Sequence, residues 1–289
     1  MAETVPGPVP GHVGRFINMA LNEDLGPGGD ITSELLLAGE KNKSKSARLI
    51  AKDGLIVAGL PFAGLAFHLV DPDVEFKPLA GEGERVKMGA VLAEVKGRAA
   101  SLLAAERVSL NILQRLCGIA TLTGKFVQAL RGLPARLCDT RKTTPGMRYM
   151  EKYAVRAGGG VNHRFGLFDG VLIKDNHIEA VGGVKKAVRL AKGRAPHLMK
   201  IEVETGNLAE VREALEAGAD VIMLDNMDIE EMEKAVRLCA KSKKAIVEAS
   251  GNVTLENIRR IGETGVDLIS TGFITHSAPA ADISMKFWL

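Results

Sequence analysis

The sequence predicts an α/β protein built around an incomplete α/β barrel of about six βα units, preceded by a smaller N-terminal α+β domain. Short apolar runs alternate with amphipathic stretches, and most of the runs lie about 22 to 29 residues apart, the spacing of βα units. Each run ends in charged, hydroxyl or turn residues, as barrel strands do at the rim that holds an active site. The GxGxxG fingerprint of a doubly wound sheet is absent, which favours the barrel.

Composition narrows the class of protein. With 289 residues, 46% hydrophobic and 25% charged, the chain can bury a large core. A net charge of +3 and 4% aromatic residues argue against a nucleic-acid partner. Cys117, Cys138 and Cys239 form no CxxC pair, which favours buried thiols in the cytoplasm. No apolar run reaches membrane-spanning length, so we expect no membrane partner.

The N-terminal part divides into a leader and a small domain. Residues 1–11 are rich in Pro and Gly and predict a flexible leader. Within 12–117, a short helix over 16–21, strand-like segments and a helix over 61–70 predict an α+β domain with a mixed sheet. The segment from Gly81 to Gly89, followed by AVLAEVKG, is similar to the hammerhead strands of biotinyl and lipoyl domains.

The remainder is assigned to the barrel and a tail. One helix is expected from Ser101 and a second over 121–130. The barrel domain spans 118–275, and we expect the tail, 276–289, to pack on the N-terminal domain. Strands are expected near 136–138, 170–173, 199–203, 221–224, 245–248 and 267–270, and helices over 183–192, 207–216, 228–240 and 254–262.

Alternation within one strand points to charge inside the barrel. In the run 200–204, Ile201 and Val203 point one way, while Lys200, Glu202 and Glu204 point the other. Since the apolar set would pack on the outer helices, the charged set would face the lumen. Buried charges must be paired or meet a ligand, and the same reasoning applies to Lys174 and Asp225. A solvated surface strand is the alternative.

Further residues suggest anion binding. A glycine triplet, 158–160, precedes His163 and Arg164, and arginine can bind a carboxylate with two parallel hydrogen bonds. Small turn residues follow the last two strands, where barrels often bind phosphate. Together these residues indicate a site for a substrate with several negative charges.

The motifs DTRKTTPGMR, GGGVNHR, KDNHI, IEVET, MLDN, EASGNVT and ISTG follow one another between Asp139 and Gly272. In this order and spacing they resemble quinolinate phosphoribosyltransferase, also called carboxylating nicotinate-nucleotide pyrophosphorylase. The resemblance extends over nearly the whole chain, from EDLGPGGDIT at Glu23 to the APAADISMKF tail.

The resemblance implies transfer of the phosphoribosyl group of phosphoribosyl pyrophosphate to quinolinate, with decarboxylation. The products would be nicotinate mononucleotide, pyrophosphate and carbon dioxide, in de novo NAD synthesis with Mg²⁺ as cofactor. The implied catalytic residues are Lys142, Lys174, Glu204 and Asp225, the two carboxylates also holding the metal directly or through ribose hydroxyls and water. Substrate-binding residues would be Arg107, Arg141, Lys142, His163, Arg164 and Lys174. The phosphate would rest on Ser250, Gly251, Asn252, Thr271 and Gly272.

The resemblance also implies a homodimer with composite active sites, in which the partner subunit supplies Arg107; a higher oligomer stays open. Two alternatives to this function remain at this stage. A related phosphoribosyltransferase could act on another ring acid. A non-catalytic hammerhead or barrel binding protein is the other, although the modified lysine hairpin of carrier domains is not evident.

Overall fold

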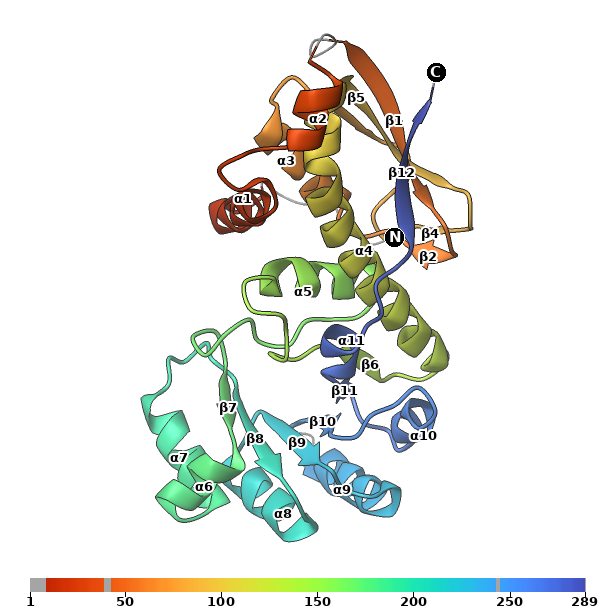
Figure 1. The fold of residues 1–289 in the computed structure, drawn as a ribbon. Helices are drawn as coiled ribbons and strands as arrows, with labels where there is room; N and C mark the ends of the chain where they lie inside the picture. The colour runs from red at the N-terminus through yellow and green to blue at the C-terminus, as the bar shows by residue number, and fades with distance from the viewer. Residues whose placement is uncertain (1–8, 39–42, 243–244, 289) are drawn as a thin grey trace. The chain divides into compact units, whose positions relative to one another are not determined.

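The computed structural model describes residues 9–38, 43–242 and 245–288, and these fall into two units (Figure 1). Unit 1 comprises Met1–Gly124, Thr143–Gly159 and Ser277–Leu289, and unit 2 comprises Lys125–Lys142 and Gly160–His276. This division differs from the predicted boundary between residues 117 and 118, because one helix runs through that point and two later segments return to unit 1. Most of the predicted leader, residues 1–8, lies outside the described residues, and the first helix begins at Gly11.

Unit 1 contains a four-stranded sheet in the order β12-β1-β5-β3. All neighbouring strands are antiparallel, so the prediction of a mixed sheet was wrong. The chain's C-terminal segment enters this sheet as β12, whose Ile283 pairs with Ala51. Two further short strands, β2 and β4, pair with each other. The strands are β1 (Ser44–Ala51), β2 (Leu55–Ile56), β3 (Glu75–Pro78), β4 (Arg85–Val86), β5 (Val91–Arg98) and β12 (Ile283–Trp288).

The core of unit 1 follows from alternation along these strands. In β1, Ala47, Leu49 and Ala51 are buried, while the intervening side chains are more exposed. The buried face packs with apolar residues of helices α3 and α4 into one cluster. The helices of unit 1 are α1 (Gly11–Leu25), α2 (Ile31–Leu36), α3 (Leu60–Val70), α5 (Arg148–Ala157) and α4 (Ala99–Ala129), whose last residues, from Lys125 on, belong to unit 2.

Helix α4 replaces the two helices expected from Ser101 and over 121–130. It is continuous for 31 residues and buries apolar side chains around most of its circumference. Gly118 lies in its middle because the chain at Pro279 passes close by; a Cβ at residue 118 would lie 2.0 Å from that carbonyl oxygen. The glycine therefore serves a close backbone contact and does not end the helix.

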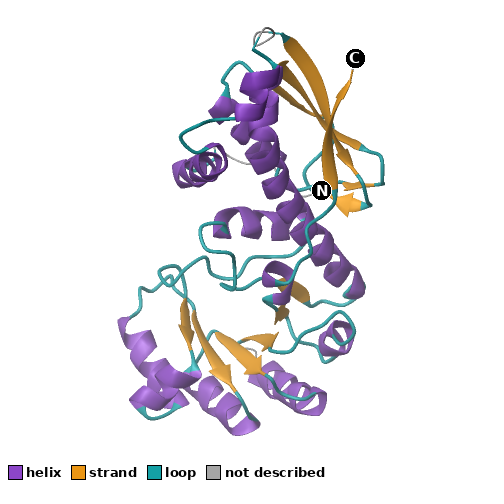
Figure 2. Ribbon diagram, viewed as in Figure 1, coloured by secondary structure: helices purple, strands orange, loops and turns teal. Residues whose placement is uncertain are grey.

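Unit 2 contains a six-stranded parallel sheet in the order β6-β11-β10-β9-β8-β7. Helices cover its outer face (Figure 2). The expected strands are all present to within about two residues. The two end strands, β6 and β7, are not paired with each other in the described part of the chain, so the barrel is incomplete, as predicted. The strands are β6 (Arg136–Cys138), β7 (Val171–Ile173), β8 (Ile201–Thr205), β9 (Val221–Asp225), β10 (Ile246–Ser250) and β11 (Leu268–Ser270).

The helices of unit 2 follow the strands in βα order. Buried residues on the outward side of the sheet, such as Val203, Ile222 and Val247, form the core beneath them. The opposite, inner side of the sheet carries the polar residues described below. The helices are α6 (Asp175–Val181), α7 (Val184–Arg194), α8 (Leu208–Ala217), α9 (Ile229–Ser242), α10 (Ile258–Glu263) and α11 (Phe273–His276).

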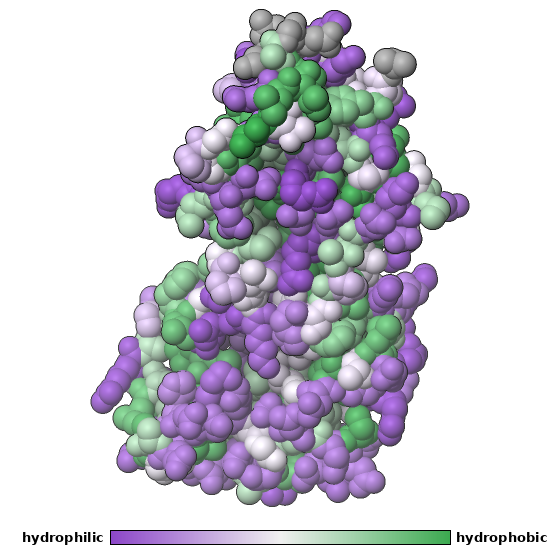
Figure 3. Space-filling model, viewed as in Figure 1, coloured by the Kyte–Doolittle hydropathy of each residue, from purple (hydrophilic) through white to green (hydrophobic). Residues whose placement is uncertain are grey.

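In the view of Figure 3, much of the surface is polar, and apolar side chains gather over α2 near the top. Helix α2 exposes Ile31, Leu35 and Leu36 to 62%, 75% and 77%. Three such large apolar side chains on one short helix are unusual for an isolated surface. Among the described helices, none is long and apolar enough to cross a membrane.

Candidate active site

The inner face of the unit 2 sheet presents polar side chains row by row. In the parallel register, Glu204 of β8 and Glu248 of β10 both lie beside Met223 of β9, and Ser250 lies beside Asp225 one step further on. Partners across a ladder point to the same face, so these side chains share the lumen. Lys200, which alternation placed with the glutamates, precedes β8 and is exposed, so this prediction was wrong for Lys200.

A pocket of about 880 Å³ opens above these rows, entirely within unit 2. It combines four cationic side chains with carboxylates and with the loops after β10 and β11. The cationic residues of its lining are Arg141, Lys142, Arg164 and Lys174, and the acidic ones are Asp175, Glu204 and Asp225. His163 also lines it. The pocket thus gathers the mixture of charges that the sequence predicted for this rim.

The guanidinium groups of Arg141 and Arg164, both in the pocket lining, lie close enough to repel each other. Burial, and then the Arg141 guanidinium, lowers the pKa of Arg164. Arg164 donates from Nη1 to the carbonyl of Gly170 at 2.9 Å, while its buried Nε has no hydrogen-bond partner among the described residues. A donor left unsatisfied beside a second guanidinium indicates a position for an anion with oxygen acceptors on more than one side.

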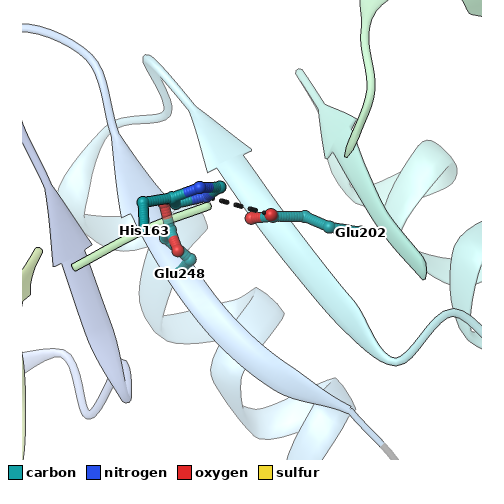
Figure 4. A group of neighbouring side chains, drawn as sticks. All are labelled: His163, Glu202 and Glu248. Atoms are coloured by element: carbon teal, nitrogen blue, oxygen red, sulfur yellow. Dashed lines mark ion pairs between the residues drawn. The ribbon is translucent and has the colours of Figure 1, made fainter. Parts of the chain in front are cut away.

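His163, which lines the pocket, also contacts two buried glutamates that are not part of the lining (Figure 4). Its Nε2 lies 3.0 Å from Oε2 of Glu202 and 3.7 Å from Oε1 of Glu248. Burial, and then the neighbouring Glu202 carboxylate, raises the pKa of Glu248 to about 7. Oε1 of each glutamate has no hydrogen-bond partner among the described residues. Among those residues, this is the one cluster of His, Cys, Asp and Glu close enough to suggest a metal site.

Glu204 and Asp225 form a second acidic group, nearer the pocket opening. Glu204 pairs with the Nζ of Lys174, and Asp225 accepts a hydrogen bond from the Asn226 side chain at 3.1 Å. They stand at the ends of neighbouring strands on the same face. One or two carboxylates completed by phosphate oxygens and water are the usual protein environment of Mg²⁺, so this pair fits such an ion.

The loops after β9, β10 and β11 bring backbone to the same pocket. Gly251, Asn252 and Asn226 all have positive φ, of 92°, 47° and 54°. A Cβ at residue 251 would lie 2.1 Å from Oδ1 of Asn226, and that atom accepts a hydrogen bond from Asn252 at 3.0 Å. Glycine and asparagine tolerate this left-handed backbone, which lets the two loops interlock closely.

Comparison with known proteins identifies the family. Sequence models of quinolinate phosphoribosyl transferase match the chain over residues 30–117 for the N-terminal domain and 119–286 for the C-terminal domain. The chain is 48% identical over 272 residues to the probable carboxylating nicotinate-nucleotide pyrophosphorylase of Synechocystis sp., spanning 94% of this chain and 91% of the relative. The chain belongs to the quinolinate phosphoribosyltransferase family.

Two further members of the quinolinate phosphoribosyltransferase family agree closely. The Bacillus subtilis relative, also named as a probable carboxylating nicotinate-nucleotide pyrophosphorylase, is 46% identical over 275 residues, covering 95% of this chain and 93% of its own. The solved structure of the nicotinate-nucleotide pyrophosphorylase from Francisella tularensis superposes with a TM-score of 0.91 at 40% identity, covering 97% and 98% of the two chains. The family fold therefore extends through both units.

Most of the predicted site residues of this family member meet in one pocket, and Arg107 does not. The side chains and loops implied for the ring acid, the ribose and the phosphate all line the unit 2 pocket, except Arg107. Arg107 is exposed on α4 of unit 1, where a different pocket of about 420 Å³ also contains Phe16, Glu23, Asp24 and Arg115. That Arg107 contributes to an active site stays a prediction, and the site in question would be that of a second chain.

The sequence analysis did not identify the residues that support the site through hydrogen bonds to its loops. Asp139 is fully buried and accepts hydrogen bonds from the backbone N–H of His163 at 2.8 Å and from the side chain of Asn162 at 2.7 Å. Asn226 and the inward-pointing Glu248 were also not assigned a role. The sequence did contain a signal for two of these residues. Asp139 directly follows an apolar strand and Glu248 lies within one, and a carboxylate buried at such a position must be paired or bound to a ligand.

Proposed function

We propose that this protein is a carboxylating phosphoribosyltransferase that joins quinolinate to phosphoribosyl pyrophosphate. The products are nicotinate mononucleotide, pyrophosphate and carbon dioxide. The observation that carries the proposal is that one pocket is lined by four cationic side chains and two carboxylates, namely Arg141, Lys142, Arg164, Lys174, Glu204 and Asp225. Family membership and this distribution of charge support the same reaction.

The cationic side of the pocket suits the ring diacid. Quinolinate carries carboxylates on adjacent ring carbons, which need more donors than one arginine can offer. Arg141 and Arg164 provide planar guanidinium groups, whose parallel donors match carboxylate geometry. Burial and then repulsion from Arg141 lower the pKa of Arg164, and an anion placed between the two guanidinium groups would relieve that repulsion. Lys142 and Lys174 complete the positive surface on which quinolinate and pyrophosphate meet.

The loops that line the pocket suit the sugar phosphate. The interlocked loops at Asn226 and at Ser250–Asn252, with Thr271 and Gly272 after β11, expose backbone to the pocket. Backbone amides at such turns are common phosphate ligands in barrels. Asn252 retains the positive φ that a glycine would adopt there, so a backbone contact to phosphate is compatible with its side chain.

Glu204 and Asp225 would hold Mg²⁺ together with the phosphoribosyl pyrophosphate. The bound ion would neutralise the pyrophosphate charge and favour its departure. On the protein side, the two carboxylates place negative charge near the ribose. That charge stabilises the oxocarbenium-like carbon that forms as the bond to pyrophosphate breaks.

The chemistry proceeds without a protein nucleophile. The ring nitrogen's electron pair forms a bond to C1 of the ribose while the C1–O bond to pyrophosphate breaks, and pyrophosphate leaves with that electron pair. The nitrogen is now cationic, so the adjacent carboxylate can leave as carbon dioxide. The electron pair of the broken C–C bond stays on the ring carbon beside the nitrogen, and a proton then binds there. The protein's contributions are orientation and charge placement.

We further propose a homodimer in which Arg107 serves the partner subunit's pocket. Arg107 does not line the unit 2 pocket. The exposed apolar side chains of α2 are consistent with a covered surface on unit 1. Mixing inactive Arg107→Ala chains with inactive Lys142→Ala chains should restore activity, because one site of each mixed dimer would hold neither defect. Activity that stays at the parental level although subunits demonstrably exchange would refute the composite site.

The reaction itself is tested with purified protein, phosphoribosyl pyrophosphate and Mg²⁺, offering quinolinate or nicotinate as the acid. Carbon dioxide release and nicotinate mononucleotide formation are followed together. We expect quinolinate to give the higher catalytic efficiency, since the density of cations exceeds the need of one carboxylate. Equal or greater efficiency with nicotinate would refute quinolinate as the substrate. Omission of Mg²⁺, with chelator present, should abolish turnover.

A further inference from the structure

We propose that Thr275 is a positioning residue for the reaction: its buried hydroxyl holds the backbone of Lys142, so that the lysine side chain enters the pocket from a fixed base. Thr275 is fully buried and does not line the pocket, whereas Lys142 does. The inference rests on the proposed function for the chemistry that Lys142 serves. The hydrogen bonds themselves lie within unit 2 and can be tested without substrate.

Both polar groups of the Lys142 backbone bond to threonine hydroxyls. The N–H of Lys142 donates to Oγ1 of Thr140 at 3.0 Å, and its carbonyl oxygen accepts a hydrogen bond from Oγ1 of Thr275 at 2.8 Å. Residues 139–144 belong to neither helix nor strand, so regular secondary structure does not fix this position. Side-chain hydroxyls therefore determine where the Lys142 backbone lies.

The Thr275 hydroxyl also joins two segments of backbone. Its oxygen lies 2.9 Å from the carbonyl oxygen of Gly272, three residues earlier in the chain. A hydroxyl has one proton to donate, so the carbonyls of Lys142 and Gly272 share it. Gly272 belongs to the loop after β11, and Thr275 belongs to α11, which follows that loop directly (Figure 1). The hydroxyl thus connects the segment that carries Lys142 to the loop proposed for the phosphate.

The side chain of Lys142 packs against the same loop. A Cβ at residue 272 would lie 2.8 Å from Cδ of Lys142 and 3.1 Å from its Cβ, so the lysine stem occupies the space that a side chain would fill. Lys142 is nevertheless exposed, and a lysine side chain can adopt many rotamers. The stem therefore stays on this loop only while the backbone from which it extends stays in place.

The other lysine of the pocket is held in a different way. Lys174 is fixed at its ammonium group, by an ion pair with Glu204. Among the described residues, Lys142 has no such ion pair, and its ammonium group is available to an anionic substrate. The placement of Lys142 must consequently come from the base of its side chain, where Thr275 and Gly272 lie.

The position of this ammonium group matters because charge moves during the proposed reaction. The leaving pyrophosphate takes the electron pair of the broken C–O bond, and a cation stabilises that charge best when it is already in place. A misplacement of about 1 Å in a catalytic site can lower the rate about a hundredfold. Loss of the Thr275 hydroxyl should therefore lower kcat, although Thr275 touches no substrate.

The first experiment measures the contact between Thr275 and Lys142 without substrate. Amide hydrogen exchange is followed by mass spectrometry on peptides that contain residues 139–144. Valine has nearly the shape of threonine but lacks the hydroxyl, so we expect this segment to exchange about tenfold faster in Thr275→Val than in wild type. Equal exchange in the two proteins would overturn the proposal, whether or not the protein turns over quinolinate.

Thr264→Val is the matched control for this comparison. The Thr264 hydroxyl donates to the carbonyl of Ile261, also three residues earlier, at 2.6 Å, and neither residue lines the pocket. The control thus removes a similar local hydrogen bond of a buried threonine without touching Lys142. Exchange over residues 139–144 should remain at the wild-type rate in Thr264→Val, and equal acceleration in both variants would overturn the proposal.

The second experiment measures steady-state kinetics of the same variants. We expect Thr275→Val to lower kcat about tenfold to a hundredfold, with a much smaller change in the KM for quinolinate. Thr275→Ala also lacks the hydroxyl and should show a similar loss, so the test does not depend on valine folding at this site. Thr275→Ser retains the hydroxyl and should recover most of the rate, while Thr264→Val should retain the wild-type kcat.

Three kinetic results would overturn the proposal. The first is a normal kcat in Thr275→Val. The second is an equal loss in Thr275→Ser, which would assign the effect to packing and not to the hydroxyl. The third is an equal loss in Thr264→Val, which would indicate general destabilisation of unit 2. If the wild-type protein forms no nicotinate mononucleotide, the proposed function fails, and hydrogen exchange still decides whether Thr275 holds Lys142.

Discussion

The two units bury carboxylates in different ways. In unit 1, Asp71 accepts hydrogen bonds from Arg98 and Ser101 on one oxygen and from the N–H of Asp73 on the other. Glu151 accepts from Arg115 on one oxygen and from the N–H of Thr144 on the other. In unit 2, Glu202 and Glu248 each keep an oxygen without a hydrogen-bond partner among the described residues.

The difference separates two uses of buried charge. A carboxylate with both oxygens bonded adds to the stability of its surroundings, and its removal leaves a partner unsatisfied. A pair of buried carboxylates with unsatisfied oxygens costs stability, so a reason must lie elsewhere. In unit 2 that reason is the pocket, whose donors and charges must be held where the substrates need them.

The largest loss of stability is expected from Glu151→Gln in unit 1. The amide cannot neutralise Arg115, and its NH₂ group would face either that guanidinium or the Thr144 N–H. We expect the free energy of unfolding to fall by about 3–5 kcal/mol, measured by denaturant titration. As a control, Glu233→Gln breaks an exposed pair with Arg237 and should cost less than about 1 kcal/mol. Equal small losses in both variants would remove the distinction between the units.

The largest loss of rate is expected from Glu204→Gln in unit 2. Glu204 supplies negative charge beside the ribose, so kcat should fall by about a hundredfold or more. Stability should change little, since its partner Lys174 is 44% exposed and can be hydrated. Steady-state kinetics and thermal unfolding are measured on the same samples, with the exposed Glu179→Gln as control. A normal rate with lowered stability would make Glu204 resemble the structural carboxylates of unit 1.

The two units also differ in how much of their structure the sequence predicted. The positions of the barrel strands, and the inward direction of Glu202 and Glu204, followed from apolar periodicity, which reports local structure. The antiparallel sheet of unit 1 depends on pairing between β1 and β12, more than 200 residues apart in the chain. Local patterns hold no information on such a pairing.

The carboxylates around His163 were beyond the sequence for a similar reason. Glu202 and Glu248 belong to two different strands, and only the fold brings their oxygens to 3.0 Å and 3.7 Å from Nε2 of His163. A histidine beside an arginine predicted a cation for the substrate, and this role stays a prediction.

A moderate effect is expected at acid pH from Asp71 in unit 1. Its hydrogen bond from Arg98, with a second from Ser101, lowers the pKa of Asp71 to about 2, well below the ordinary range of an aspartate. Since the folded pKa lies below the unfolded one, its contribution is complete above about pH 4 and is lost as the pH falls through about 2. Asp71→Asn should lower the free energy of unfolding at pH 6 by about 2 kcal/mol and at pH 2 by much less. A deficit that is the same at both pH values would contradict this.

The smallest effect, with the opposite sign, is expected from Glu248→Gln in unit 2. The pKa of Glu248 is raised to about 7 by burial and by Glu202, with Glu204 adding repulsion and His163 opposing it. Because the folded pKa lies above the unfolded one, the wild-type protein should lose stability as the pH rises from about 4.5 to about 7. The uncharged amide removes that loss, so the variant should be more stable than wild type at pH 8 by about 1 kcal/mol and nearly equal at pH 5. Denaturant titrations at the two pH values test this. A variant that is less stable at pH 8 would show that His163 holds Glu248 as a charged partner, and the barrel's buried carboxylates would then stabilise the fold as those of unit 1 do.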